Sequence, residues 1–123
     1  MKNPNDNFLK GRLRSLTFAL RGAWLLVTTE HSIMVQLSIA FIMTVIGFIM
    51  GISAQEWMFQ LLAIGLVLVA ESLNTGIEKL SDFVHPEYHK RIGFIKDISA
   101  GAATFAAIIA IIIGLIIYVP KFS

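Results

Sequence analysis

The sequence predicts an all-α membrane protein with three transmembrane helices and an N-terminal amphipathic helix on the membrane surface. Hydrophobic residues make up 56% of the 123 residues, charged residues only 15%, and the mean hydropathy is +0.76. A soluble domain of this length has a large surface for its volume and needs a mostly polar exterior. The segments 32–55 and 98–120 also lack charged residues, and each exceeds the roughly 20 residues that a helix needs to cross a bilayer. A soluble helical bundle is the alternative, and these two segments argue against it.

The length allows one domain, spanning 1–123, and the composition excludes several kinds of site. There is no cysteine, so disulfides, thiolate metal sites and cysteine nucleophiles are ruled out. No G-x-x-x-x-G-K-[ST] loop is present, and the three histidines do not follow a zinc-binding spacing. No nucleic-acid partner is expected.

The surface helix is predicted over about residues 6–28. Its apolar residues recur at spacings of three and four, and the cations Lys10, Arg14 and Arg21 lie off that stripe. The cluster Asn5–Asp6–Asn7 offers N-cap residues. This pattern is typical of a helix in the membrane interface with its cations near anionic headgroups, although it also serves as a topology signal. The apolar stripe consists of Leu9, Leu13, Leu16, Leu20 and Trp24.

The three spans are predicted at about 32–52, 57–80 and 97–119. The middle segment is uncharged only from Trp57 to Ala70, so a helix that crosses the membrane there must include Glu71. Nine of the ten Lys and Arg residues precede the first span or lie between the second and third, and only Lys121 follows the last. The positive-inside rule therefore predicts a cytoplasmic N-terminus and an outside C-terminus. Small residues at four-residue spacing in the third span, including Ala106, Ala110 and Gly114, favour close helix contacts and oligomerisation.

Glu71, Asn74 and Glu78 form a polar ladder on one face of the second span, because they stand at positions i, i+3 and i+7. An ionised acid near the centre of a transmembrane helix costs about 2.5–3.5 kcal/mol on insertion scales. Topology does not require this cost, so a functional role is the default hypothesis for Glu71. Glu78 lies nearer the interface and has solvation as its alternative explanation.

Three further charges are expected at the same membrane depth as the ladder. Glu30 precedes the first span, and Lys96 and Asp97 begin the third. Carboxylates that flank a hard cation, with an ammonium group for a phosphate, suit Mg²⁺-dependent phosphoryl transfer. A carboxylate deeper in the membrane is positioned to deprotonate a lipid hydroxyl. Taken alone, Lys96 and Asp97 are also ordinary charges for the start of a helix.

At these residues the sequence resembles the small prokaryotic integral-membrane diacylglycerol kinases, including their undecaprenol kinase branch. The stretch "ESLNTGIEKLSD" is similar to the family's E-x-L-N-[ST]-x-I-E-x-x-x-D signature. The stretch "PEYHKRIGFIKDISAGAA" is similar to the family's E-Y-H segment followed by K-D-x-x-[AS]-[AG]-A, and "RGAWLLVTTE" resembles the segment that brings in the first acid. The resemblance covers nearly the whole chain.

The resemblance implies a homotrimer in the bacterial plasma (inner) membrane that transfers the γ-phosphate of MgATP to a lipid alcohol. By position, Glu71 would be the general base, with Asn74 and Asp97 as further catalytic residues. The same correspondence assigns Mg²⁺ to Glu30 and Glu78 and the lipid substrate to Glu71, Arg21 and Trp24. ATP contacts are expected from Ser15, Glu30, Glu78, Glu87, Tyr88, His89, Lys96 and Asp97. Ser15 departs from the pattern, because some members have tyrosine there.

Two questions stay open at the level of sequence. Diacylglycerol and undecaprenol both present a primary hydroxyl at the interface, and the resemblance leans toward the undecaprenol branch. The rival function is a small oligomeric protein that conducts ions or protons along the face of Glu71, Asn74 and Glu78. A conducting path should continue across the membrane, whereas residues 57–70 contain only Gln60 as a polar side chain with hydrogen-bonding capacity beyond the indole of Trp57. A purely structural oligomer is a third interpretation, and it gives Lys96 and Asp97 no reason to meet the acids.

Overall fold

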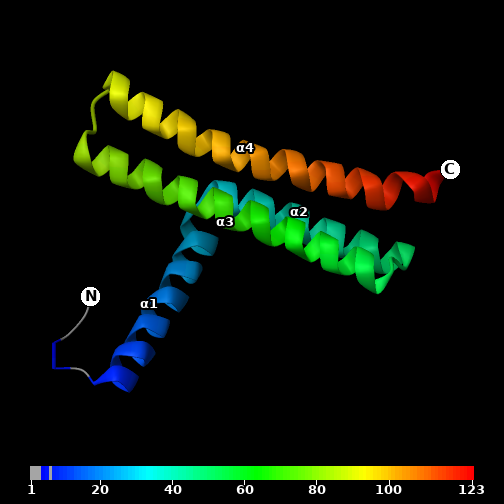
Figure 1. The fold of residues 1–123 in the computed structure, drawn as a ribbon, viewed down its shortest axis with the longest axis horizontal. Helices are drawn as coiled ribbons and strands as arrows, with labels where there is room; N and C mark the ends of the chain where they lie inside the picture. The colour runs from blue at the N-terminus through cyan, green and yellow to red at the C-terminus, as the bar shows by residue number, and fades with distance from the viewer. Residues whose placement is uncertain (1–3, 6) are drawn as a thin grey trace.

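The computed structural model describes residues 4, 5 and 7–123, which form four α-helices and a short terminal 3-10 helix. Lys2 and Asp6, which entered the predictions of topology and capping, lie outside the described residues. Figure 1 shows three long helices side by side and one helix that leaves them at an angle. In chain order the elements are α1 (Phe8–Thr29), α2 (His31–Met50), α3 (Ala54–Val84), α4 (Lys90–Tyr118) and η1 (Val119–Phe122).

Helix α1 is the predicted amphipathic helix, and it projects away from the other three (Figure 1). The side chain of Asn7 caps its first turn by accepting a hydrogen bond from the backbone N–H of Lys10, at 2.8 Å. Its main packing contact is with α2. Its apolar stripe is therefore uncovered within one chain, and Trp24, for example, is 68% exposed. Such a helix has its apolar face available for a membrane interface or for another subunit.

Helices α2, α3 and α4 run antiparallel to their neighbours in sequence and form the bundle. Gly51 ends α2 in the left-handed conformation, with φ of 61°, which glycine adopts without steric cost. Close packing at this turn also depends on Gly47, because an added Cβ there would come within 2.8 Å of the Trp57 ring. Helix α3 contacts α4 along its length and α2 less extensively.

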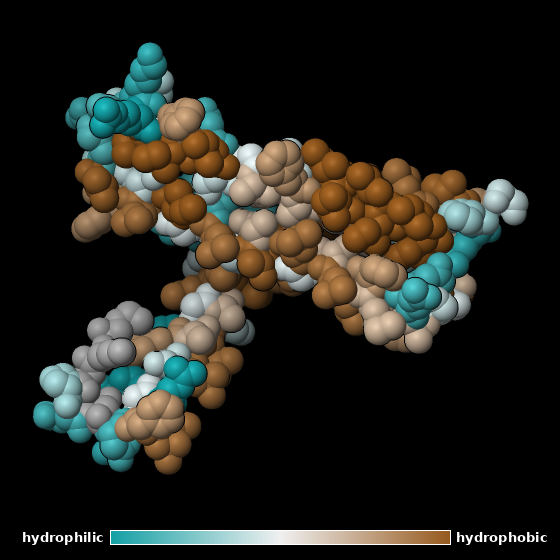
Figure 2. All heavy atoms as spheres, in the orientation of Figure 1, coloured by the Kyte–Doolittle hydropathy of each residue, from teal (hydrophilic) through white to brown (hydrophobic). Residues whose placement is uncertain are grey.

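All three bundle helices are long and apolar enough to cross a membrane, which confirms the predicted fold class. Figure 2 shows a hydrophobic band along the bundle with hydrophilic atoms at its two ends. We call the end where α3 stops and α4 starts the charged end, and the end that contains Gly51 and the C-terminus the far end. The large side chains exposed along the band include Phe41, Leu62 and Phe105. This surface has the composition of one that faces lipid.

Helices α3 and α4 extend beyond the predicted spans at the charged end. Helix α4 begins at Lys90 instead of near residue 97, and His89 caps it by accepting a hydrogen bond from the backbone N–H of Arg91. Helix α3 continues to Val84 instead of about residue 80. Hydropathy marks only the apolar part of a helix, whereas backbone hydrogen bonds continue into the charged turns beyond it. Both helices therefore carry charged residues past the apolar band.

At the far end, α2, α3 and α4 share one buried polar network. The Tyr118 hydroxyl donates to Gln60 Oε1 at 2.5 Å, and the Gln60 amide donates to the Met43 carbonyl at 3.1 Å. Gln60 and Tyr118 are both buried. The network joins the Met43 carbonyl of α2, the Gln60 side chain of α3 and the Tyr118 side chain of α4. It therefore fixes the positions of the three helices relative to one another in an environment that offers no water.

Candidate functional site

The polar ladder lies on the face of α3 that the sequence predicts, toward the charged end. Glu71, Asn74 and Glu78 are all half-buried in the single chain. Asn74 Oδ1 is buried and has no hydrogen-bond partner among the described residues. Because buried amide oxygens are nearly always paired, this acceptor calls for a donor from outside the described contacts. The ladder is therefore a polar surface whose hydrogen-bonding capacity is not exhausted by the fold.

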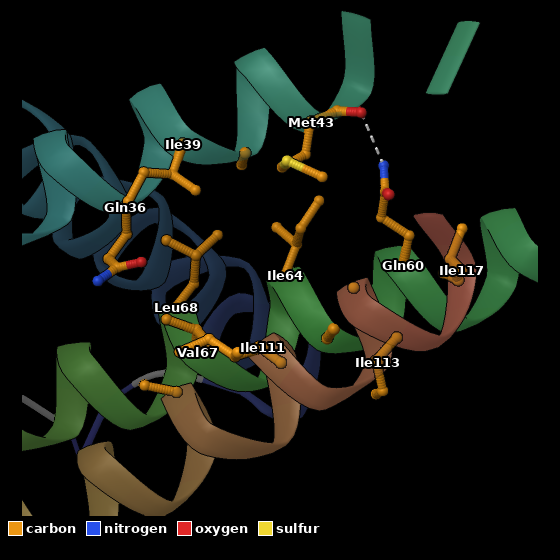
Figure 3. A pocket seen from close by; sticks show the side chains of 15 residues that line it. Gln36, Ile39, Met43, Gln60, Ile64, Val67, Leu68, Ile111, Ile113 and Ile117 are labelled. Carbon is orange, nitrogen blue, oxygen red and sulfur yellow. Dashed lines mark hydrogen bonds between the residues drawn. The ribbon is translucent and has the colours of Figure 1, made fainter. Parts of the chain in front are cut away.

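An apolar groove runs along the same face of α3, nearer the far end. It has a volume of about 330 Å³ and is open along one side, with α2 and α4 as its walls. Figure 3 shows Gln36, Val67 and Leu68 at one end of the groove and Gln60 and Ile117 at the other. On α4 its wall includes the small residues Ala107, Ala110 and Gly114.

The groove and the ladder are continuous on α3. Gln60, Ile64 and Val67 line the groove, and Glu71 follows Val67 by four residues, which is one helical turn. One face of a single helix therefore changes from apolar to acidic over one turn. A molecule with a hydroxyl group at one end of a hydrocarbon chain has the same polarity pattern.

Glu30 joins α1 to α2 and reaches toward α3. Its Oε2 accepts a hydrogen bond from the Thr29 hydroxyl at 2.8 Å and lies 3.3 Å from Lys79 Nζ. The Thr29 hydrogen bond, followed by the Lys79 ammonium, lowers the pKa of Glu30 against the opposing effect of burial. Glu30 is therefore an ionised carboxylate that already attracts a cation.

Lys96 and Asp97 lie in the first turns of α4. The side chain of Lys96 contacts α3, whereas that of Asp97 is exposed to solvent. Lys96 Nζ is 2.5 Å from Asp82 Oδ1 on α3, and this ion pair links the two helices at the charged end.

The Asp82–Lys96 pair and the Gln60–Tyr118 pair lie the same number of residues apart along both helices. Helices α3 and α4 therefore keep one register along their length, which places the ladder alongside the small residues of α4.

The loop between α3 and α4 contains three residues that the resemblance associates with ATP. His89 is the cap of α4, and its ring lies edge-on to that of His85, with centroids 5.2 Å apart. His85 Nδ1 donates to the Glu87 carbonyl at 2.6 Å, which orders the turn. The Tyr88 ring lies close to Gly93, and this side chain is 88% exposed. Glu87, Tyr88 and His89 thus lie on one exposed loop at the charged end.

The remaining predicted residues lie on α1, apart from the ladder of the same chain. The Ser15 hydroxyl donates to the Gly11 carbonyl at 3.0 Å, within the helix. The Arg21 guanidinium lies 5.9 Å from the centre of the Phe18 ring, and Trp24 is exposed. Helix α1 packs mainly against α2, and no contact between these three side chains and the ladder acids is seen within the described part of one chain.

No group of three or more His, Asp or Glu side chains in the described part of the chain is close enough to hold a metal ion alone. Within the described residues, Glu30 and Glu78 are therefore not completed to a metal site by a third carboxylate or imidazole. This arrangement still suits Mg²⁺, which is usually bound by one or two carboxylates together with substrate phosphates and water.

Lys79 and Asp82 are the site residues to which sequence reasoning assigned no role. Each forms an ion pair with a predicted site residue, Lys79 with Glu30 and Asp82 with Lys96. The signal that was available is their spacing, because opposite charges at i and i+3 are neighbours on one helix, and Asp82 also follows Glu78 by four residues on the same face. Their partners could not be identified without the relative positions of the helices.

The fold and the site together define an integral-membrane protein with acidic and basic side chains gathered at one end of a three-helix bundle. The profile of the prokaryotic diacylglycerol kinase family matches residues 17–118. The chain is also 36% identical over 115 residues to the undecaprenol kinase of Bacillus subtilis (strain 168), with 94% of each chain covered. The chain therefore belongs to the prokaryotic diacylglycerol kinase family.

Membership of this family makes the chain a lipid kinase, and a kinase of this family uses ATP. The conducting alternative is not favoured. The structure adds a physical reason, because Gln60 is the polar side chain that would have to continue the path from the ladder, and it is buried and hydrogen-bonded to Met43 and Tyr118.

Proposed function

We propose that the protein transfers the γ-phosphate of MgATP to the primary hydroxyl of a long-chain lipid alcohol, with undecaprenol as the preferred substrate. The observation that carries this proposal is the continuous face of α3, on which an apolar groove leads into an acidic ladder. A lipid alcohol that lies along this face has its hydrocarbon chain in the groove and its hydroxyl group at Glu71.

Glu71 is the proposed general base. Its carboxylate accepts the proton of the lipid hydroxyl while that oxygen bonds to the γ-phosphorus, and the bond to the β–γ bridging oxygen breaks to release ADP. Asn74, whose Oδ1 has no partner among the described residues, would accept a hydrogen bond from the lipid hydroxyl through Oδ1 or donate one to the phosphate through Nδ2. The half-buried position of Glu71 keeps competing water away from the reacting oxygen.

The charges at the charged end would hold the nucleotide. Lys96 supplies an ammonium group that neutralises phosphate charge, and Asp97 completes the polar surface beside it. The exposed loop with Glu87, Tyr88 and His89 is available to the base and ribose. Ser15 of α1 is a further proposed ATP contact.

The donor set fits a hard divalent cation, because Glu30 is ionised and already paired with a cation, and Glu78 is a second carboxylate at the same end. These two residues would hold Mg²⁺ together with phosphate oxygens. When bound, the ion neutralises charge on the β- and γ-phosphates.

The preference for undecaprenol rests on two arguments. The relative with 36% identity is an undecaprenol kinase. In addition, a single groove leads toward Glu71, which suits an alcohol with one hydrocarbon chain better than diacylglycerol with two. Diacylglycerol is the alternative substrate.

The proposed assembly is a homotrimer with a composite site. Helix α1, which carries Ser15, Arg21 and Trp24, projects from its own bundle (Figure 1) and packs mainly against α2, so a neighbouring chain would bring these side chains to the ladder. Arg21 and Trp24 would then contact the lipid substrate. Mixing inactive Glu71→Gln subunits with inactive Lys96→Met subunits should restore partial activity if these residues act across an interface, and mixtures that exchange subunits but stay inactive at every ratio would contradict that arrangement.

The proposed orientation places the charged end and the N-terminus in the cytoplasm, where ATP is available, and the C-terminus outside. Single cysteines at the exposed positions Gln55 and Pro86 test this orientation in intact cells. A membrane-impermeant maleimide should label the Gln55→Cys variant and not Pro86→Cys. Labelling of Pro86→Cys alone would reverse the orientation and contradict the proposed ATP site.

The substrate is tested with purified protein in mixed micelles and radiolabelled ATP. Undecaprenol and diacylglycerol should be supplied at matched surface concentrations, with and without Mg²⁺. We expect a higher kcat/KM for undecaprenol and no transfer without the divalent cation. Equal or greater kcat/KM for diacylglycerol would overturn the substrate preference, and no transfer to either lipid by folded protein would overturn the proposed function.

A further inference from the structure

Two opposite charges at the charged end of α3 each contact a residue of the proposed nucleotide site. Lys79 Nζ lies 3.3 Å from Glu30 Oε2, and Asp82 Oδ1 lies 2.5 Å from Lys96 Nζ. Lys79 and Asp82 are three residues apart, so they extend from neighbouring positions of one helix toward two different segments. One reaches the α1–α2 junction and the other reaches α4.

Stability alone is a weak explanation for these two ion pairs. The side chains of Lys79 and Asp82 are 67% and 59% exposed, and ion pairs with such exposure contribute little to folding. Their partners are less exposed, at 18% for the Glu30 side chain and 36% for that of Lys96. A carboxylate with little access to water gains more from a nearby cation than a solvated one does.

The partners are also the groups that the proposed function assigns to the two parts of MgATP. Glu30 is the proposed cation ligand, and Lys96 is the proposed phosphate contact. Lys79 is thus a positive charge beside the cation ligand, and Asp82 is a negative charge beside the phosphate contact. The positive charge of Lys79 would be replaced by the positive divalent cation, and the negative charge of Asp82 would be replaced by the negative phosphate.

We propose that Lys79 and Asp82 are internal counter-ions that neutralise Glu30 and Lys96 until the divalent cation and the nucleotide phosphate bind. This inference rests on the proposed function, because it assigns Glu30 and Lys96 to MgATP. Lys79 leaves Glu30 when the cation binds, and Asp82 releases Lys96 to the phosphate. The two are positioning residues that contact neither substrate.

The arrangement has a measurable consequence for affinity. Each ion pair must open before its ligand binds, so removal of the counter-ion should tighten binding. Exposed ion pairs contribute a factor of about two to five to an equilibrium, and the gain in affinity should be of that size. Because salt screens exposed charges, the gain should shrink at high ionic strength.

The cation half is tested by titrating Mn²⁺ into the full-length protein in micelles, without nucleotide, and following free Mn²⁺ by electron paramagnetic resonance. Lys79→Met should lower the Kd for Mn²⁺ by about two- to fivefold. Lys90→Met is the matched control, because Lys90 is an exposed lysine at the same end and is not paired with Glu30. It should leave the Kd nearly unchanged.

The phosphate half uses a fluorescent ATP analogue in the presence of EDTA. Asp82→Asn should tighten its binding by about two- to fivefold, because Lys96 is then free to contact phosphate. Glu56→Gln at the far end is the control for the loss of one negative charge. Reaction of Lys96 with an amine-specific reagent, read by mass spectrometry, should rise in Asp82→Asn and fall again when the analogue is added.

The outcomes separate this inference from the function on which it rests. If Glu30→Gln weakens Mn²⁺ binding but Lys79→Met leaves it unchanged or weaker, Lys79 is not a counter-ion and the proposed function stands. Equal tightening by Lys79→Met and Lys90→Met would show a general charge effect and would also overturn the inference. If Glu30→Gln does not affect Mn²⁺ binding, or the analogue never protects Lys96, the proposed site itself is wrong.

Discussion

The two ends of the α3–α4 pair use polar residues in opposite ways. At the far end, Gln60 and Tyr118 are buried and hydrogen-bonded to each other, and Gln60 also holds the Met43 carbonyl. At the charged end, Asn74 Oδ1 is buried without a partner among the described residues, and the ladder acids are only half-buried. The far end satisfies its polar groups within one chain, whereas the charged end leaves capacity for another molecule.

This contrast distinguishes structural from functional polarity in a membrane helix. Both kinds of residue cost free energy to insert, and both lie on the same face of α3. The two kinds of residue differ in whether hydrogen bonds within the fold offset the free energy of insertion. Gln60 recovers it through hydrogen bonds to two other helices, which fix their register. Glu71 and Asn74 recover less of it, which is expected of groups that are reserved for a substrate.

The largest effect is expected from Glu71→Gln. The substitution keeps the size and hydrogen-bonding capacity of the side chain but removes its basicity. Phosphate transfer should fall by about 10²–10⁴-fold, the range that general base catalysis supplies. Turnover is measured with radiolabelled ATP, and circular dichroism verifies that the helices remain.

Gln60→Glu is the matched control for this prediction, because it places the reverse change on the same face of α3 at the far end. It adds a carboxylate away from Glu71 and removes the amide donor to the Met43 carbonyl, so it should lower stability while transfer per folded molecule stays near normal. Near-normal turnover in Glu71→Gln would break the distinction between the two ends and would move the base to Asp97.

A smaller effect is expected from Glu30→Gln and Glu78→Gln. Each removes one anionic oxygen from the proposed Mg²⁺ ligands. The Mg²⁺ concentration for half-maximal activity should rise by at least about tenfold. Loss of a residue that only supports a metal ligand already lowers metal affinity by about 10- to 100-fold, and loss of a ligand should cost no less. Excess Mg²⁺ should recover part of the activity. A Mg²⁺ titration that matches the wild type in both variants would remove these residues from the cation site.

The sequence predicted more of the helices than of the contacts between them. Charge-free segments and the positions of Glu71, Asn74 and Glu78 follow from a single helix, because hydropathy and the 3.6-residue period are local properties. The pairs Glu30–Lys79 and Asp82–Lys96 depend on the register between helices, which no local pattern contains. The groove was also unpredicted, because it forms only where α2 and α4 both flank α3.

At the far end, Tyr118→Phe should reduce stability without reducing activity per folded molecule. The hydroxyl that donates to Gln60 Oε1 is lost, and that buried oxygen loses its hydrogen-bond donor. Hydrogen bonds between transmembrane helices contribute about 0.6–1.7 kcal/mol, and the loss should be in this range. Unfolding in mixed micelles is measured alongside Tyr88→Phe, an exposed tyrosine whose substitution should leave stability unchanged. A larger loss of activity than of folded protein would show that the far end also serves catalysis.

The smallest effect is expected from Lys121→Met, also at the far end. Lys121 Nζ lies 3.0 Å from Glu56 Oε2, and both side chains are 27% exposed. Glu56 keeps a second partner in the capping box, because the Ser53 backbone N–H donates to its Oε1 at 2.9 Å. The carboxylate is therefore not left unpaired, and the loss of stability should be small, as for other exposed ion pairs.

This small loss should also decrease with added salt, because the pair is accessible to ions. Unfolding of Lys121→Met and of wild type is compared at low and high ionic strength, with Lys90→Met as the control for removal of a lysine that forms no ion pair in the described part of the chain. Nucleotide and Mn²⁺ affinities should be unchanged in Lys121→Met, in contrast to the tightening expected for Lys79→Met. The two lysine–glutamate pairs would then differ in function because one of them shares its carboxylate with a substrate. If Lys121→Met also alters cation affinity, the two ends of the bundle are coupled through α3 and α4, and the separation of structural from functional polarity is incomplete.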